Sequence, residues 1–239
     1  MSDTWSKADL HIHSDQSDGL ASIPEIMDYV AEKTDLRVIA ITDHNTIEGA
    51  LFAKSLEDMY DFEVVVGEEI SSTSGHVLGL FLKEYVPPRL TPMETIARIT
   101  EQGGIAIIPH PFANRAFGPF GLKGMGKALN GLAYQALEVF NASPYLMLAN
   151  RLAAKFFAGG QGIAATGGSD AHVLKAIGLG HTMFRGTTAQ DLRASIENLE
   201  TYASAEKGQL QLALRYIFRY PQIRRLQSWN WERCKAGRP

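Results

Sequence analysis

The chain has 239 residues, of which 45% are hydrophobic, and its formal net charge is −3 at pH 7. This balance allows a sizeable core and excludes the strongly basic character of a general nucleic-acid or membrane-surface binder. The single cysteine, Cys234, cannot form an internal disulfide, no apolar run is long enough to span a bilayer, and residues 1–10 lack the apolar region of a signal peptide. We therefore expect a soluble cytoplasmic protein.

Seven short apolar segments predict β-strands. Several contain the unbroken runs VIAI, VVV and IAII, which are typical of strands buried on both faces of a parallel sheet. The predicted strands cover residues 8–13, 38–42, 63–66, 76–81, 105–109, 136–140 and 163–166.

Helical segments separate most of these strands. Ser22 and Thr91 stand where an N-cap is expected, each with a proline in the first turn and a glutamate three residues on. Thr188 begins a weaker example of the same pattern. The alternation of strands and helices predicts a parallel α/β architecture, either a barrel or a doubly wound sheet.

Composition changes only near the end of the chain. Residues 209–239 contain seven basic residues and one acidic residue, together with leucines that suggest a helix with an apolar face. We divide the chain into a main domain at 1–208 and a basic C-terminal helix or tail at 209–239, packed on the same domain. The solvated face of a closing helix is the simpler interpretation of this charge, and a patch for a polyanionic substrate is the alternative.

The seven histidines follow a pattern. Five of them end or soon follow a predicted strand: His11, His13, His44, His110 and His172. His76 opens its strand, and we interpret His181 as an ordinary structural histidine. In a parallel α/β fold the carboxyl ends of the strands are where active sites are built.

Carboxylates accompany these histidines at Asp18, Glu68, Glu69 and Asp170. Because alternate residues of a strand point to the same face, the side chains of the H-x-H pair in the first strand aim into one pocket. Imidazole and carboxylate groups together are donors for Zn²⁺, Mn²⁺ or Fe²⁺. The set is too large for one tetrahedral site, so we expect two or three divalent metal ions that share a bridging carboxylate.

The segments DLHIHSDQSDG, ITDHNT, GEEIS, GH, PHP and GSDAH occur in this order between about residues 8 and 185. In this order they resemble the motifs of the PHP (polymerase and histidinol phosphatase) family of metal-dependent phosphoesterases. The resemblance implies a distorted (β/α)7 barrel with a trinuclear metal centre at the carboxyl ends of the strands.

Carried over motif by motif, the resemblance assigns nine metal ligands. They are, for the first ion, His11, His13 and Asp170; for the second, Asp18, His44 and His172; and for the third, His76 and His110, with Glu69 bridging the first and third. Glu69 is preferred to Glu68 because it stands two residues before the serine of EIS. Asp43 is expected either to orient a neighbouring ligand or to serve only as a turn residue.

The resemblance implies hydrolysis of a small phosphomonoester or a nucleotide phosphate by a metal-activated water, without a protein nucleophile. Ser14 and Ser17 are then turn or phosphate-contact residues, and Ser14 is our candidate for substrate binding. Asn141 is a weaker candidate to face the pocket. The candidate substrate-binding cations are Arg115 first, then Lys123 and Lys175. Residues 112–126 form either a loop that covers the pocket or an ordinary packed loop.

Three alternatives stay open. A 5′–3′ exoribonuclease or other oligonucleotide phosphoesterase would take short nucleic acid as its substrate. A histidinol phosphatase ranks lower, because nothing in the chain indicates recognition of an imidazole amino alcohol. A metal-bearing regulatory or structural module without catalysis would be expected to lack some of the ligands. The expected partner is therefore a phosphorylated small molecule or nucleotide, with short nucleic acid as the alternative and no membrane.

Overall fold

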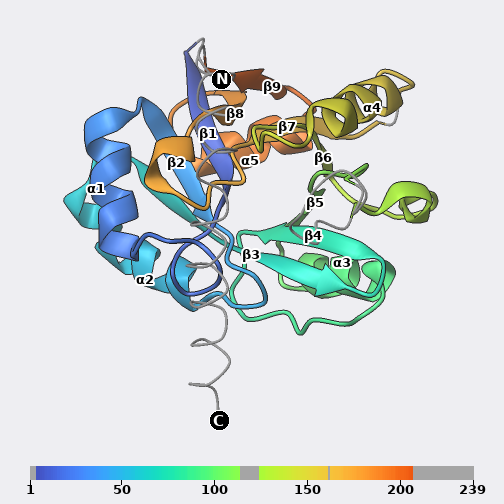
Figure 1. Cartoon of the computed structure of the whole chain (residues 1–239), viewed down its shortest axis with the longest axis horizontal. Coiled ribbons are helices and arrows are strands. Elements are labelled where there is room, and N and C mark those ends of the chain that lie inside the picture. Colours follow the sequence, from blue (N-terminus) through green and yellow to red (C-terminus); the bar gives the residue numbers. More distant parts are fainter. Residues whose placement is uncertain (1–3, 114–123, 161, 207–239) are drawn as a thin grey trace.

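The computed structural model describes residues 4–113, 124–160 and 162–206. In this part of the chain, nine strands form one mixed sheet with helices around its outside (Figure 1). The strands are β1 (Trp5–Ile12), β2 (Leu36–Ile41), β3 (Glu63–Ser72), β4 (Gly75–Leu80), β5 (Ile105–Ile108), β6 (Ala136–Asn141), β7 (Ala164–Gly168), β8 (Gly180–Arg185) and β9 (Tyr202–Ala205). The helices are α1 (Ile23–Lys33), α2 (Glu48–Leu56), α3 (Pro92–Glu101), α4 (Met147–Phe157) and α5 (Ala189–Glu197), with short 3-10 turns η1 (Glu57–Met59), η2 (Gly126–Leu129) and η3 (Leu174–Ala176).

The strand order is β7-β6-β5-β4-β3-β2-β1-β8-β9. β4 runs antiparallel to both of its neighbours, β8 is antiparallel to β1 and β9, and the remaining pairs are parallel. Beyond β7 the chain returns to β1, where the His13 N–H donates to the Ala171 carbonyl at 2.9 Å. The sheet is thus a nearly closed barrel, which confirms the predicted fold class and adds antiparallel strands to the expected parallel ones.

Each predicted strand corresponds to an observed one, but β8 and β9 were not predicted. β8 reads GHTMFR and β9 reads YASA, and neither contains the apolar run that marks the other strands. β3 also extends beyond its predicted end to Ser72, because its polar second half pairs with β4 as a hairpin. These segments become strands through pairing with neighbours, which no local pattern reveals.

The three predicted helix starts are correct. In α3 the Glu94 N–H donates to the Thr91 hydroxyl at 3.2 Å, while the Thr91 N–H donates back to the Glu94 carboxylate at 2.9 Å. Thr188 caps α5 with the same reciprocal arrangement, and Ser22 caps α1, where its N–H donates to the Glu25 carboxylate at 2.8 Å. None of the helices in the described ranges is long and apolar enough to cross a bilayer.

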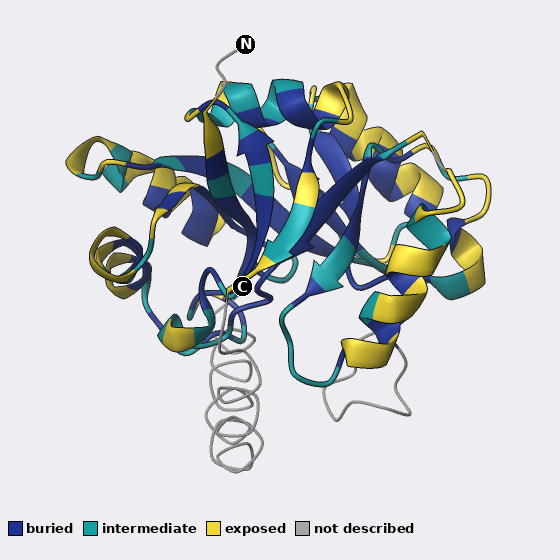
Figure 2. Cartoon of the chain, turned by 90° about the horizontal axis from the view of Figure 1, so that it is seen from above, coloured by how far each residue is buried: buried dark blue, intermediate teal, exposed yellow. Residues whose placement is uncertain are grey.

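The core lies on both sides of the strands, and the helices expose their outer faces (Figure 2). One cluster joins Leu10 and Ile107 of the strands to Leu192 and Ile196 of α5. The Ala189 N–H of α5 donates to Glu63, the first residue of β3, so α5 packs where parallel strands begin. The opposite rim, where those strands end, is left for polar residues.

Candidate metal centre

All nine predicted ligands lie near the same rim of the barrel. Six of the histidines and three carboxylates are delivered by β1, β2, β3, β4, β5 and β7 or by the residues just beyond those strands. His76 is no exception to this arrangement, although it lies near the beginning of its strand. Because β4 runs antiparallel to β3, its beginning pairs with the end of β3, with His76 opposite Ser71.

The most enclosed of the predicted ligands, which we call the inner group, are His11, His13, Glu69, His110 and Asp170; each is at most 7% exposed. The His11 and His13 Nε2 atoms both lie 3.3 Å from Glu69 Oε2. They also lie 3.5 Å and 3.4 Å from Asp170 Oδ1. The other oxygen of Glu69 lies 3.1 Å from His110 Nε2. The two carboxylates therefore stand between converging imidazoles.

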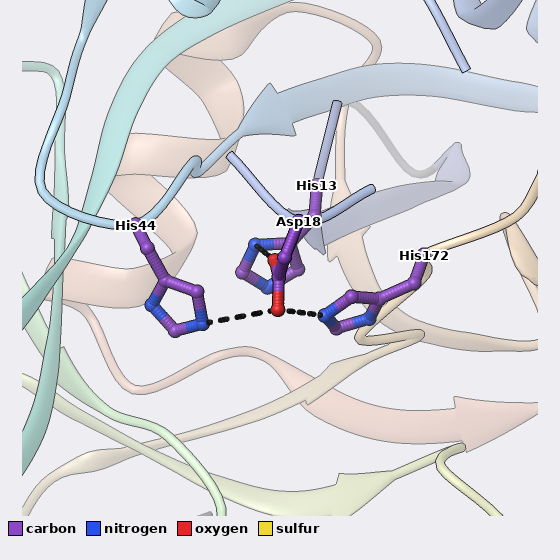
Figure 3. Close-up of side chains that lie close together, drawn as sticks. All are labelled: His13, Asp18, His44 and His172. Atoms are coloured by element: carbon purple, nitrogen blue, oxygen red, sulfur yellow. Dashed lines mark ion pairs between the residues drawn. The ribbon is translucent and has the colours of Figure 1, made fainter. Parts of the chain in front are cut away.

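The remaining ligands, which we call the outer group, are Asp18, His44, His76 and His172, with side chains that are 15–27% exposed. Asp18 Oδ2 lies between His172 Nε2 at 3.2 Å and His44 Nε2 at 3.9 Å (Figure 3). His13 joins the two groups, because its Nδ1 atom is 3.6 Å from Asp18 Oδ1. His44 and His76 also reach Glu69 through their Nδ1 atoms, at 3.3 Å and 2.7 Å.

This donor set fits divalent metal ions. Four overlapping sets of three or four donors each bring one ligand atom per residue within 4.8 Å of the others. Two ligand atoms that are each about 2.1 Å from a tetrahedral Zn²⁺ lie roughly 3.4 Å apart, which is the spacing found in the inner group. Both ring nitrogens of His13, the Nδ1 atoms of His44 and His110, and Asp18 Oδ1 are buried without a hydrogen-bond partner among the described residues. A cation bound between these donors would complete their bonding.

The electrostatics of the centre favour added positive charge. Burial alone lowers the pKa of the His13 imidazole, but Asp170 and Glu69 more than offset it and raise that pKa to about 10. Burial opposes ionisation of Glu69 and Asp170 as well, yet the surrounding histidines hold both pKa values well below the ordinary range. Within the described ranges these carboxylates form ion pairs only with histidines. The carboxylates therefore stay ionised and demand either protons on the histidines or metal ions between them.

Two inner ligands have unusual backbone conformations. His110 has a φ of 29° and Asp170 a φ of 52°, whereas residues with a side chain rarely adopt positive φ. Such strain persists only where surrounding contacts impose it, and it clusters at functional sites. The loops after β5 and β7 thus hold these two side chains in place at a cost in backbone energy.

Asp43 supports the loop that carries Asp18. Its carboxylate accepts hydrogen bonds from the Ser14 N–H at 2.7 Å and from the hydroxyls of Ser14 and Ser17, each at 2.6 Å. Asp43 is therefore connected to Asp18 through this loop rather than by direct contact. Ser14 is fully buried, with its hydroxyl donated to Asp43, so its position does not support the predicted role in substrate binding.

Three buried polar residues lie near the inner group: Asp9 and Glu138, to which the sequence assigned no role, and Asn141, which was a weaker candidate to face the pocket. Asp9 accepts the N–H groups of Ser169 and Gly178, at 3.0 Å and 2.8 Å, and burial raises its pKa to about 6. Glu138 and Asn141 of β6 contact the inner group directly: Glu138 Oε1 lies 3.0 Å from His11 Nδ1, and the Asn141 amide donates to Asp170 Oδ2 at 3.3 Å. A carboxylate inside the apolar run ALEVF was the available signal for Glu138, because such strands seldom bury a charge.

The other candidate residues that the structure describes lie outside the donor sets. Glu68 points away from the histidines and accepts the Val86 N–H at 3.0 Å, which agrees with the choice of Glu69. His181 lies in β8, bonds to the Gly178 carbonyl and belongs to none of the donor sets in the described ranges. Lys175 is exposed on η3. Arg115, Lys123, most of the 112–126 loop and the 209–239 tail lie outside the described residues.

Comparisons with known proteins place this barrel in a family. A family model described as PHP-associated matches residues 148–201. The uncharacterized protein MJ1587 of Methanocaldococcus jannaschii is 43% identical over 147 residues, which cover 57% of this chain and 82% of the relative. A two-domain protein of Bacteroides vulgatus, containing a predicted PHP-like metal-dependent phosphoesterase, has a similar fold with a TM-score of 0.69 at 20% identity. That match covers 86% of this chain and 66% of the other.

Two named enzymes share shorter stretches with the chain. The phosphoribosyl 1,2-cyclic phosphate 1,2-diphosphodiesterase of Eggerthella lenta is 33% identical over 85 residues, covering 33% of this chain and 32% of the enzyme. The 5′-3′ exoribonuclease of Haemophilus influenzae is 30% identical over 105 residues, covering 42% of this chain and 38% of the enzyme. Fold and site thus define a barrel hydrolase with a histidine–carboxylate metal centre. The chain belongs to the PHP family of metal-dependent phosphoesterases.

Proposed function

We propose that this protein hydrolyses the phosphate ester of a small phosphorylated molecule or nucleotide, with two or three divalent ions held by the inner and outer groups. The observation that carries the proposal is the convergence of six histidines on Glu69, Asp170 and Asp18. Ions bound there would supply Lewis acidity, which lowers the pKa of water and neutralises charge on the phosphoryl group and the leaving oxygen. We infer Mn²⁺, Zn²⁺ or Fe²⁺ from the mixture of imidazole and carboxylate donors.

The inner and outer groups would have different roles because they differ in burial. Inner-group residues would hold ions out of contact with solvent, because all five side chains are almost completely buried. Outer-group residues would meet the substrate, because Asp18, His44 and His172 are partly exposed beside one another. Asp43 positions Asp18 by anchoring residues 14–17 through three hydrogen bonds.

Neither Ser14 nor Ser17 is placed to act as a nucleophile. The Ser14 and Ser17 hydroxyls both donate to Asp43, a carboxylate that is itself buried among these donors. An attacking hydroxyl must also be accessible to the substrate, and both of these serines are fully buried. The arrangement therefore supports direct attack by water, with Arg115 kept as our candidate for binding the phosphate.

Hydrolysis of short nucleic acid is the second candidate, and the similarity to the Haemophilus influenzae exoribonuclease favours it. A substrate panel separates the two: mononucleotides, bisnucleotides, sugar phosphates and oligoribonucleotides, each assayed with Mn²⁺ and again after chelation. We expect chelator-sensitive release of phosphate from a small substrate at a kcat/KM well above that for oligoribonucleotides. Preferred shortening of oligoribonucleotides would favour the second candidate. A fully metal-loaded protein without turnover on any substrate would point to a non-catalytic module.

A further inference from the structure

β6 contributes no metal ligand, yet two of its side chains reach the inner group. Glu138 is 2% exposed, and its partners are N–H groups rather than lysines or arginines of the described ranges. Its Oε2 atom accepts the His110 backbone N–H at 2.7 Å and the Asn141 amide at 2.9 Å. The Asn141 amide also reaches Asp170 Oδ2 at 3.3 Å. One carboxylate and one amide thus connect three inner ligands.

An irregularity in β6 makes this arrangement possible. Residues three apart in a regular strand point to opposite faces, so Glu138 and Asn141 would normally diverge. Between β6 and β7, however, Glu138 pairs with Thr166 and Phe140 with the next residue, Gly167, so β6 carries one extra residue. Such a bulge shifts the alternation by one and turns both side chains toward the centre.

In the neighbouring strand β7, Gly168 leaves space for the Glu138 side chain. A Cβ atom added at Gly168 would lie 2.5 Å from Glu138 Oε1 and 2.8 Å from the His11 Cβ atom. Neither approach is compatible with ordinary van der Waals contact. Gly168 therefore permits the hydrogen bond between Glu138 and His11, which any larger residue would disturb.

We propose that Glu138, supported by Asn141, is a positioning residue for the inner metal site. Its carboxylate accepts the Nδ1 proton of His11, which leaves the Nε2 lone pair directed toward Glu69 and Asp170. Its second oxygen holds the His110 N–H, where the backbone adopts positive φ. Asn141 then fixes Asp170 relative to both. The inference rests on the proposed function only in taking the inner group to bind metal ions.

The test measures Zn²⁺ and Mn²⁺ binding to the full chain by competition with chelators, without any substrate. Glu138→Gln removes the charge at nearly constant volume, and loss of such a partner typically weakens metal affinity about 10–100-fold. We expect that loss in the tightest class of sites, while the class that depends on Asp18 and His172 keeps its affinity. The visible spectrum of the Co²⁺-loaded variant should also change, because the geometry of the His11 ligand changes.

Three further variants keep the test decisive. Asn141→Ala leaves Glu138 in place and should weaken the same class by a smaller factor, even if Glu138→Gln fails to fold. Gly168→Ala should reproduce the Glu138→Gln defect through steric displacement alone. Glu68→Gln is the matched control, because Glu68 is equally buried but bonds to Val86, so metal affinity should not change.

Unchanged metal affinity and an unchanged Co²⁺ spectrum in both Glu138→Gln and Asn141→Ala would overturn the proposal, even if both variants unfolded at lower temperature. That result would leave Glu138 as an ordinary buried structural residue. Weakened metal binding combined with no hydrolysis of any phosphate ester by the parent protein would instead overturn only the proposed function.

Discussion

The inner and outer groups are built from the same two kinds of donor but differ in their support. Three residues of the inner group are supported from β6: His11 and the His110 backbone bond to Glu138, and Asp170 bonds to Asn141. In the outer group the support comes from loop backbone: the His172 Nδ1–H donates to the Asp170 carbonyl at 2.9 Å, and the Leu20 N–H donates to the His172 carbonyl at 3.0 Å. Burial and preorganisation favour tight metal binding inside, while partial exposure leaves the outer side accessible to substrate.

The largest expected effect on kcat/KM comes from His13, the inner-group residue that joins the two groups. His13→Ala removes a donor next to Glu69, Asp170 and Asp18 at once. Since metal ions contribute several kcal/mol to such reactions, kcat/KM should fall by roughly a thousandfold or more. Steady-state kinetics would measure the loss, with circular dichroism to verify folding.

His181→Gln is the control for this variant, because His181 is also a buried histidine but lies outside the donor sets. It should retain metal content and turnover. Normal turnover in folded His13→Ala would show that neither group depends on the residue that joins them.

A pair of variants compares the groups directly. His110→Ala removes a buried partner of Glu69, and breaking a buried pair costs about 3 kcal/mol or more. Its Tm without metal should therefore fall by roughly 6–12 °C. His172→Ala removes a partly exposed partner of Asp18, and we expect a much smaller shift. Thermal unfolding in the presence of a chelator measures both, and equal shifts would remove the distinction between the groups.

The dependence of stability on pH should differ between metal-free and metal-loaded protein. Burial lowers the pKa of His13 but Asp170 and Glu69 raise it overall, from 6.5 to about 10. A raised histidine pKa means that the pairing contributes fully below pH 6.5 and is lost as the pH rises toward 10. The depressed pKa values of Glu69 and Asp170 mean the reverse, so their contribution is lost only in acid.

Metal-free protein should therefore lose stability between pH 6.5 and about 10, whereas metal-loaded protein, with the ions in place of the protons, should not. Thermal unfolding across this range, with chelator and with Zn²⁺, gives the comparison. Parallel curves for the two forms would contradict the charge distribution inferred for the inner group.

The smallest effect on kcat/KM is expected for Ser14→Ala, which tests how the loop that carries Asp18 is supported. The Ser14 hydroxyl donates to the Asp43 carboxylate, and a bond of this kind contributes about 1.5–3 kcal/mol. We expect a lower Tm, with kcat/KM reduced less than about tenfold because the Ser14 N–H and Ser17 still anchor the loop. A raised KM at unchanged Tm would instead restore Ser14 as a substrate contact.

Much of the centre could be predicted because its ligands are local signals. The chain has few histidines, so two of them in an otherwise apolar strand are a clear signal. The segments PHP and SDAH, each just after a strand, are signals of the same kind. The buried runs VIAI and IAII and the capping boxes at Ser22 and Thr91 are likewise readable without neighbours. Glu138 could not be assigned in this way, because its partners His11 and His110 are 127 and 28 residues away.

Local chemistry therefore determined which residues could bind metal, since donor type and strand alternation are properties of short segments. Only the tertiary structure decided how these donors are brought together and divided between the inner and outer groups. Curling of the sheet brings the end of β7 to β1, the antiparallel β4 turns His76 to the common rim, and the bulge in β6 turns Glu138 and Asn141 inward. The physical reason is that strand direction, closure and register arise from pairing between distant segments, which leaves no trace in any one of them.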